Sequence, residues 1–147
     1  MEQAQKQLKI SSLIVLLFAG LSLVQIITEL AFGELNSATI PEGAPDNILL
    51  ITKTILLVFT IIFLLPKVYV GIKGLRIAKN PTSSKTHIIW AIIILVFEAL
   101  GFIDPIIALV NQGNTFDNIR ALAGVLLEVF IIFEYIKYAR DLSKLVE

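Results

Sequence analysis

A segment near the start of the chain, residues 10–28, contains no charged side chain and is mostly apolar. A helix of about 20 such residues is long enough to cross the hydrocarbon core of a bilayer, which is about 30 Å thick. The whole chain is similarly apolar, because 56% of its residues are hydrophobic, only 16% are charged and the mean hydropathy is +0.86. A soluble domain of 147 residues could not bury that much apolar side chain. We therefore expect an integral membrane protein.

Four apolar segments, separated by stretches of turn-forming residues, predict four transmembrane helices. They cover residues 10–32, 47–70, 87–110 and 117–138. Pro66 and Pro105 are expected to bend the second and third helices. The prediction is a single all-α transmembrane domain over residues 1–147, folded as a four-helix, up-and-down bundle.

The connections contain residues that favour the ends of helices. The first connection, residues 33–46, is rich in turn formers, and Asp46 is expected to cap the second helix. That helix is expected to continue through a polar stretch and to stop at Asn80 and Pro81. Candidate caps for the third helix are Ser83, Ser84 and Thr86.

The basic residues predict the orientation of the helices. Most of the 12 Lys and Arg residues lie in the two termini and the middle connection: Lys6, Lys9, Lys67, Lys73, Arg76, Lys79, Lys85, Lys137, Arg140 and Lys144. The first and third connections contain acidic residues instead. The positive-inside rule then places both termini and the middle connection in the cytoplasm. We expect Lys67 and Lys73 to extend toward this interface, which would also hold several rings: His87, Trp90, Tyr69, Tyr135 and Tyr138.

Four charged residues, one in each predicted helix, are expected to form a layer near the outer boundary of the membrane. They are Glu29, Lys53, Asp104 and Arg120. One interpretation is that they form ion pairs that clasp the helices together. The other is a polar vestibule for a substrate or ion that enters from outside. Their balanced charge favours the first interpretation.

Glu98 and Glu128 form a second group, because both lie about halfway along their predicted helices. In antiparallel neighbours the two carboxyl groups would meet near the membrane midplane. Desolvation and mutual repulsion prevent both from staying ionised unless a cation joins them. Three arrangements are open: the pair shares a proton, it binds and releases protons or cations for transport, or Lys53 neutralises one member.

Each predicted helix also has a face of polar or small residues, which is typical of the interior of a membrane bundle. Ser22 and Gln25 share a face of the first helix with Glu29, Thr60 lies between Lys53 and Lys67 at seven-residue steps in the second, and Tyr135 follows Glu128 by seven. This polar seam is consistent with two interpretations: ordinary packing between membrane helices, or the lining of a hydrated cavity.

Several classes of function have no support in the sequence. The chain has no cysteine, a single histidine at position 87 and a formal net charge of zero. No catalytic or phosphate-binding motif is present. We therefore expect no cofactor, metal site, nucleic-acid binding or enzymatic activity.

The expected role is that of a small, non-enzymatic accessory or assembly subunit that acts in the lipid bilayer through a membrane-protein partner or as a homo-oligomer. The alternative is a proton- or cation-coupled transporter or channel that uses Glu98 and Glu128. Residues 71–80 and the general layout are similar to small four-span bacterial membrane proteins, which implies a bacterial plasma membrane.

Overall fold

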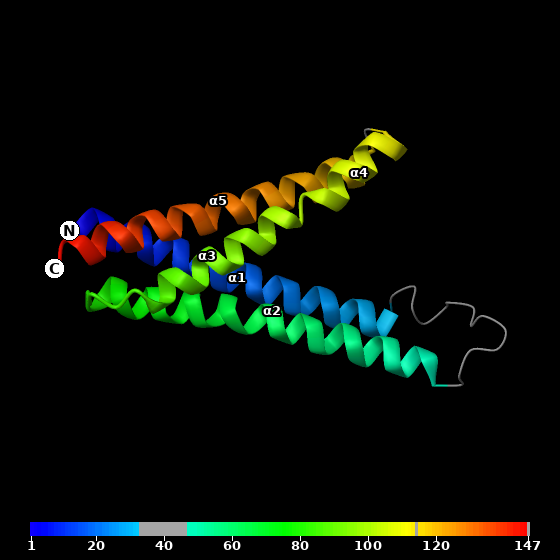
Figure 1. Cartoon of the computed structure of the whole chain (residues 1–147), viewed down its shortest axis with the longest axis horizontal. Coiled ribbons are helices and arrows are strands. Elements are labelled where there is room, and N and C mark those ends of the chain that lie inside the picture. Colours follow the sequence, from blue (N-terminus) through cyan, green and yellow to red (C-terminus); the bar gives the residue numbers. More distant parts are fainter. Residues whose placement is uncertain (33–46, 114, 147) are drawn as a thin grey trace.

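A computed structural model describes residues 1–32, 47–113 and 115–146, and within these ranges the chain forms helices and no strands. The helices are α1 (Glu2–Phe32), α2 (Ile48–Lys79), α3 (Thr86–Leu100), α4 (Ile103–Gln112) and α5 (Phe116–Lys144), as Figure 1 shows.

Three helical stretches are long and apolar enough to cross a membrane. They are Glu2–Phe32, Ile48–Lys79 and Thr86–Asn111, the last of which spans α3 and α4. Helix α5 has sufficient length, with 29 residues, but charged side chains such as Arg120, Glu128 and Glu134 interrupt its apolar sequence. It is therefore the least apolar of the long helices.

The helices pack in a four-sided arrangement. Helix α1 contacts α2 and α5, helix α3 contacts the same two helices, and α4 contacts α5. Helices α2 and α5 therefore face each other across one diagonal, and α1 and α3 across the other. Both termini and the connection between α2 and α3 lie at the same end of the molecule (Figure 1).

Buried side chains lie in only one half of the molecule. The closed half, with the buried side chains, consists of residues 2–19, 70–79, 86–94 and 132–144. In the remaining, open half, no residue whose side chain is described is buried. Figure 1 shows the reason: the pair α1–α2 and the pair formed by α3–α4 with α5 diverge from the end that carries the termini. The molecule thus has two arms joined at a packed base.

Close helix packing in the closed half depends on a small residue at Gly74. A Cβ atom at this position would lie 2.5 Å from Cε2 of Tyr135 and would also collide with Oγ of Ser12. Real contacts are longer than this, so only glycine lets α2 approach α1 and α5 so closely. Ser12 is itself buried and donates its hydroxyl to the Leu8 carbonyl at 2.6 Å.

We expect Gly74→Ala to lower the free energy of unfolding by about 1–3 kcal/mol, because the added methyl group overpacks a closed contact. Thermal unfolding of the purified protein in detergent measures the change. Gly124→Ala is the matched control, since a Cβ at Gly124 meets nothing within 4 Å. The control should leave stability unchanged or raise it by up to about 1 kcal/mol through helix propensity. Equal destabilisation by both changes would contradict the packing.

The structure corrects several predicted helix ends. Helix α1 begins at Glu2 and thus extends N-terminally beyond the predicted span over residues 10–32, because its polar first turns contain no residue that stops a helix. The residue before α3 is Lys85, and no side chain caps this helix, so the expected caps at Ser83, Ser84 and Thr86 are wrong. Helix α2 does end before Asn80 and Pro81, as expected.

Two further predictions concern the region around the first connection. Asn47, without a side-chain cap hydrogen bond, precedes α2. The expected cap at Asp46 and the loop over residues 33–46 lie outside the described residues.

Helix α5 begins after Thr115, whose hydroxyl accepts a hydrogen bond from the Asn118 amide.

The third predicted span is broken rather than only bent. Helix α3 ends at Leu100, the turn contains Gly101 and Phe102, and Pro105 lies in the first turn of α4. Pro105 has no amide proton to donate to the Gly101 carbonyl, and its ring crowds that carbonyl. The break therefore precedes the proline by one turn. Pro66, by contrast, lies within an unbroken α2.

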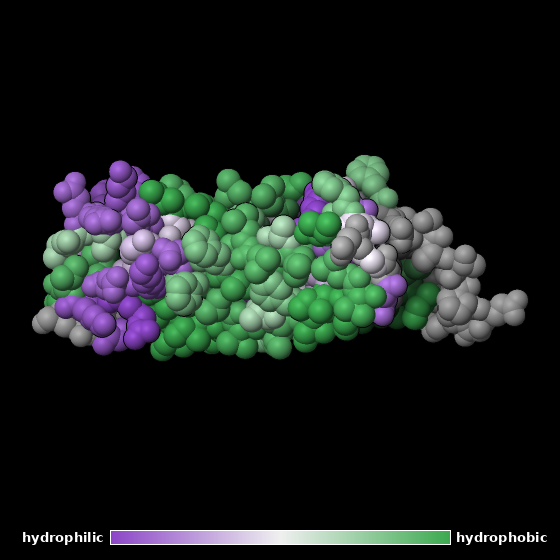
Figure 2. Space-filling view, turned by 90° about the horizontal axis from the view of Figure 1, so that it is seen from above, coloured by the Kyte–Doolittle hydropathy of each residue, from purple (hydrophilic) through white to green (hydrophobic). Residues whose placement is uncertain are grey.

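A band of hydrophobic surface covers the middle of the molecule (Figure 2). Polar residues gather at the end with the termini, and a smaller polar group lies near the opposite end. Large apolar side chains from every long helix are exposed, for example Val24, Phe59, Ile62, Val96 and Phe130. Such an extended apolar exterior is suited to lipid or to a protein partner and not to water.

Candidate functional site

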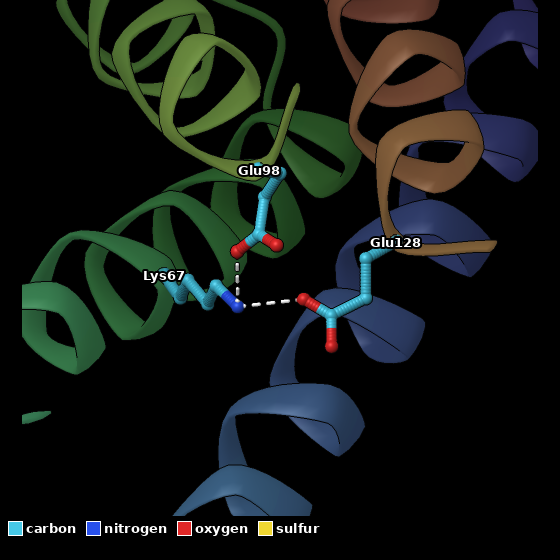
Figure 3. Close-up of polar contacts among 3 residues, drawn as sticks. All are labelled: Lys67, Glu98 and Glu128. Atoms are coloured by element: carbon cyan, nitrogen blue, oxygen red, sulfur yellow. Dashed lines mark hydrogen bonds and ion pairs between the residues drawn. The ribbon is translucent and has the colours of Figure 1, made fainter. Parts of the chain in front are cut away.

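One lysine joins two glutamates from different helices (Figure 3). Nζ of Lys67 lies 2.5 Å from Oε1 of Glu98 and 2.7 Å from Oε2 of Glu128. Lys67 belongs to α2, Glu98 to α3 and Glu128 to α5. We call these three residues the charged triad. The distance to Glu128 is that of a charge-assisted hydrogen bond and Glu98 forms a close ion pair, and an ammonium group has enough protons to donate to both carboxylates.

The packing of the closed half positions the triad. Each member lies about one helical turn beyond a residue of the last buried layer: Val70, Ile94 and Ile132. The triad therefore lies where the closed half ends and the arms begin. The Tyr135 hydroxyl also connects α5 to α2, because it donates a hydrogen bond to the Val70 carbonyl at 3.1 Å.

The first helix closes the triad from one side without adding charge. A small pocket of about 10 Å³ between α1, α2 and α5 is lined by Val15, Phe18, Lys67, Glu128, Ile131 and Ile132. The apolar side chains leave no space there for more than about one water molecule. The charges of the triad must therefore balance one another, or a group on a side other than that of α1 must balance them.

The triad has an unequal number of charges. When all three groups are ionised, two carboxylates surround one ammonium and the sum is one negative charge. Only 13% of the Lys67 side chain, 19% of Glu98 and 23% of Glu128 are exposed. Desolvated charges of one sign are costly without a partner, so the excess favours the binding of one proton or one monovalent cation.

Two cavities adjoin Lys67 from different directions. The first, of about 560 Å³, lies along α1 and α2, and its walls are Ser22, Ile55, Phe59, Thr60, Phe63, Leu64 and Lys67. The second, of about 350 Å³, lies between α2 and α3, and its walls are Ile62, Phe63, Pro66, Lys67, Trp90, Ile93, Ile94, Phe97 and Glu98. We call the second one the α2–α3 groove. Both cavities are mostly apolar, with polar groups at a few points.

The structure brings Glu98 and Glu128 together through Lys67, which none of the three arrangements left open had included. Lys67 was expected to extend to the cytoplasmic interface, and that prediction is wrong because its ammonium points to the two carboxylates. Lys53, the counter-ion in one of the three arrangements left open, lies four turns earlier in α2. The sequence did indicate that Lys67 could face the bundle interior: Lys53, Thr60 and Lys67 recur every seven residues and therefore share one helix face.

The expected outer layer is divided between the two arms. Glu29 and Lys53 belong to the α1–α2 arm, whereas Asp104 and Arg120 belong to α4 and α5. Glu29, Asp104 and Arg120 are exposed, and Lys53 is half-buried. Because the arms diverge, the layer consists of two separate acid–base sets (Figure 1).

The residues of the predicted polar seam occupy different environments. Ser22 and Thr60 line the cavity along α1 and α2. Tyr135 is fully buried, and Gln25 is exposed. The seam thus runs from a packed base into an accessible cavity.

His87 is buried rather than interfacial. Its side chain packs edge-on against the Tyr135 ring, with 6.0 Å between the ring centroids. Trp90, one turn later, is exposed beside the α2–α3 groove. Within the part of the chain that the structure describes, no group of His, Asp or Glu side chains has the arrangement of a metal site.

Comparison with known proteins gives no relative: no family model, curated protein or solved structure matches the chain.

Proposed function

We propose that the chain is a multi-pass membrane protein with four spans and cytoplasmic termini. The support is the apolar band of Figure 2, the three helices of membrane-crossing length, and the position of the termini beside the basic α2–α3 connection. Helix α5 completes the bundle as the fourth span, because its charged Glu128 faces a lysine inside the protein and not lipid.

Within this frame, we propose that the protein is a non-enzymatic accessory subunit that holds a transmembrane helix of a partner, or of a second copy, between its arms. The observation that supports this role is the open half, in which no described side chain is buried although most are apolar. Close packing of helices stabilises membrane proteins, and an unfilled face can supply it to an incoming helix.

Site-specific photo-crosslinking tests this role. A photoreactive phenylalanine at Phe59, which lines the cavity along α1 and α2, should yield one protein adduct of defined mass in native membranes. An adduct of twice the chain mass identifies a second copy. The control is Leu13, which is equally apolar and 50% exposed but lies in the closed half. If Phe59 and Leu13 both give only lipid adducts, the accessory role is excluded.

The excess negative charge of the triad favours a second candidate, a proton- or cation-coupled transporter. In this role Glu98 or Glu128 binds the ion, and Lys67 stays paired with the other carboxylate. Each single variant, Glu98→Gln or Glu128→Gln, leaves a neutral lysine–glutamate pair and should fold.

Liposomes that contain the purified protein and a pH-sensitive dye test this candidate. A potassium diffusion potential should drive proton entry in the wild type, and either glutamine variant should abolish it. Glu134→Gln is the control, because Glu134 pairs with Lys137 on the same helix surface at 3.6 Å, outside the triad. Equal flux in all four proteins, or none in the wild type, would rule out proton coupling.

A further inference from the structure

The α2–α3 groove combines features that suit a cationic, amphiphilic ligand. Besides Lys67, its only charged side chain is Glu98, and the other walls are aliphatic or aromatic. Phe63 and Phe97 meet there edge to face, with centroids 5.1 Å apart. Aromatic rings next to a carboxylate are the recurring surroundings of substituted ammonium groups. The groove therefore has a polar end at the triad and an apolar body.

The charge at the polar end can accept one cation. Oε1 of Glu98 accepts the Lys67 ammonium, whereas its second carboxylate oxygen points away from Lys67, on the side of Glu128, in Figure 3. Glu128 remains at 2.7 Å from Nζ and can balance Lys67 by itself. A bound monocation would then neutralise Glu98 and bring the four charges to zero.

The apolar body of the groove continues past the triad. An adjoining shallow pocket of about 430 Å³ shares Ile62, Pro66 and Trp90 with the groove and extends to Leu65 and Tyr69. Trp90 is 40% exposed and Ile62 is 56% exposed, so this part of the groove is open at the molecular surface. A ligand can therefore enter from the apolar exterior, with its charged group toward Glu98.

The same walls argue against an inorganic ion. A hard cation such as Na⁺ or Ca²⁺ requires several oxygen ligands, and Glu98 is the only side chain among the groove's lining residues that offers oxygen. A large organic cation needs only one counter-charge and gains from apolar contact.

We propose that the α2–α3 groove is a binding site for one amphiphilic organic monocation, with its charge at Glu98 and its apolar part against Trp90, Phe97 and Ile62. The site is distinct from the position of the crosslinking test, because Phe59 is not among the lining residues of the groove. If the protein is a transporter, the second candidate function, this site identifies organic monocations as its class of substrate.

Binding of tetraphenylphosphonium to the purified full-length chain in a non-ionic detergent tests the proposal. Equilibrium dialysis against protein-free micelles should show saturable binding of one cation per chain. Tetraphenylborate, an anion of the same shape, should not bind above the micelle background. Glu98→Gln should weaken binding of the cation by at least about tenfold, because it removes the counter-charge.

Two further variants distinguish a loss of the counter-charge from a general loss of folding as the cause of weaker binding. Trp90→Ala keeps every charge and should weaken cation binding about threefold to tenfold through loss of ring contact. Glu134→Gln should bind like the wild type, since Glu134 lies outside the groove. Unchanged binding in both Glu98→Gln and Trp90→Ala, or equal binding of tetraphenylborate, would overturn the site. Neither result would affect the photo-crosslinking outcome at Phe59 or the proton flux.

Discussion

Replacement of Lys67 by methionine is expected to lower the free energy of unfolding by about 3–5 kcal/mol, the cost of removing one partner from a buried ion pair. Methionine has a similar length and fills the same space, so the loss comes from charge. Without the ammonium, Glu98 and Glu128 face each other across a largely desolvated site. Unfolding of the purified protein in mixed micelles, at increasing denaturing-detergent fraction, measures the effect.

A rescue experiment distinguishes charge from packing. The triple variant Lys67→Met, Glu98→Gln, Glu128→Gln has no charge in the triad and should recover most of the lost stability, because neutral groups of similar volume often replace buried ion pairs without cost. Glu134→Gln added to Lys67→Met instead should recover nothing. If Lys67→Met is as stable as the wild type, the lysine is not the counter-ion of the two carboxylates.

Leu142→Ala is expected to be the other strongly destabilising change, with a loss of about 2–4 kcal/mol. Leu142 is fully buried in the closed half and belongs to the core cluster around Leu8 and Tyr135. Truncation leaves a cavity that rigid neighbouring helices cannot fill. Thermal unfolding in detergent gives the comparison with the wild type.

Leu126→Ala is the matched control for this prediction, because it makes the same truncation in the same helix. Leu126 lies in the open half and is 53% exposed. We expect its loss to stay below about 1 kcal/mol, since few protein contacts disappear. Similar losses at Leu142 and Leu126 would show that the two halves are packed alike and that the arms close together in solution.

The apolar sequence runs predict the centres of the helices well and their ends less well. Long uncharged segments leave few alternatives to helices, which explains the agreement for α1 and α2. The start of α1 at Glu2 was missed because the polar residues before position 10 are good helix formers and contain no stop signal. A bend was expected at Pro105, but the helix breaks at Gly101, because proline acts on the carbonyl four residues before it.

The candidate site was predictable in part. Counting residues from the helix starts placed Glu98 and Glu128 at one depth, and the structure joins them. The same counting assigned Lys67 to the interface because it lies near the end of the predicted second span, residues 47–70, whereas its ammonium group points to Glu98 and Glu128. Local sequence also does not specify which helices face each other across a bundle. The α2–α5 diagonal that brings Lys67 to Glu128 depends on tertiary packing.

Cysteine accessibility tests most directly the central claim that four spans enclose the charged triad in the membrane. Single cysteines at Ser83 and Thr115, in a chain that has no other cysteine, lie before α3 and before α5. In intact bacterial cells a membrane-impermeant thiol reagent should label position 115 only, and position 83 should react only in inverted vesicles. Labelling of both positions from the same side would contradict a membrane crossing between them.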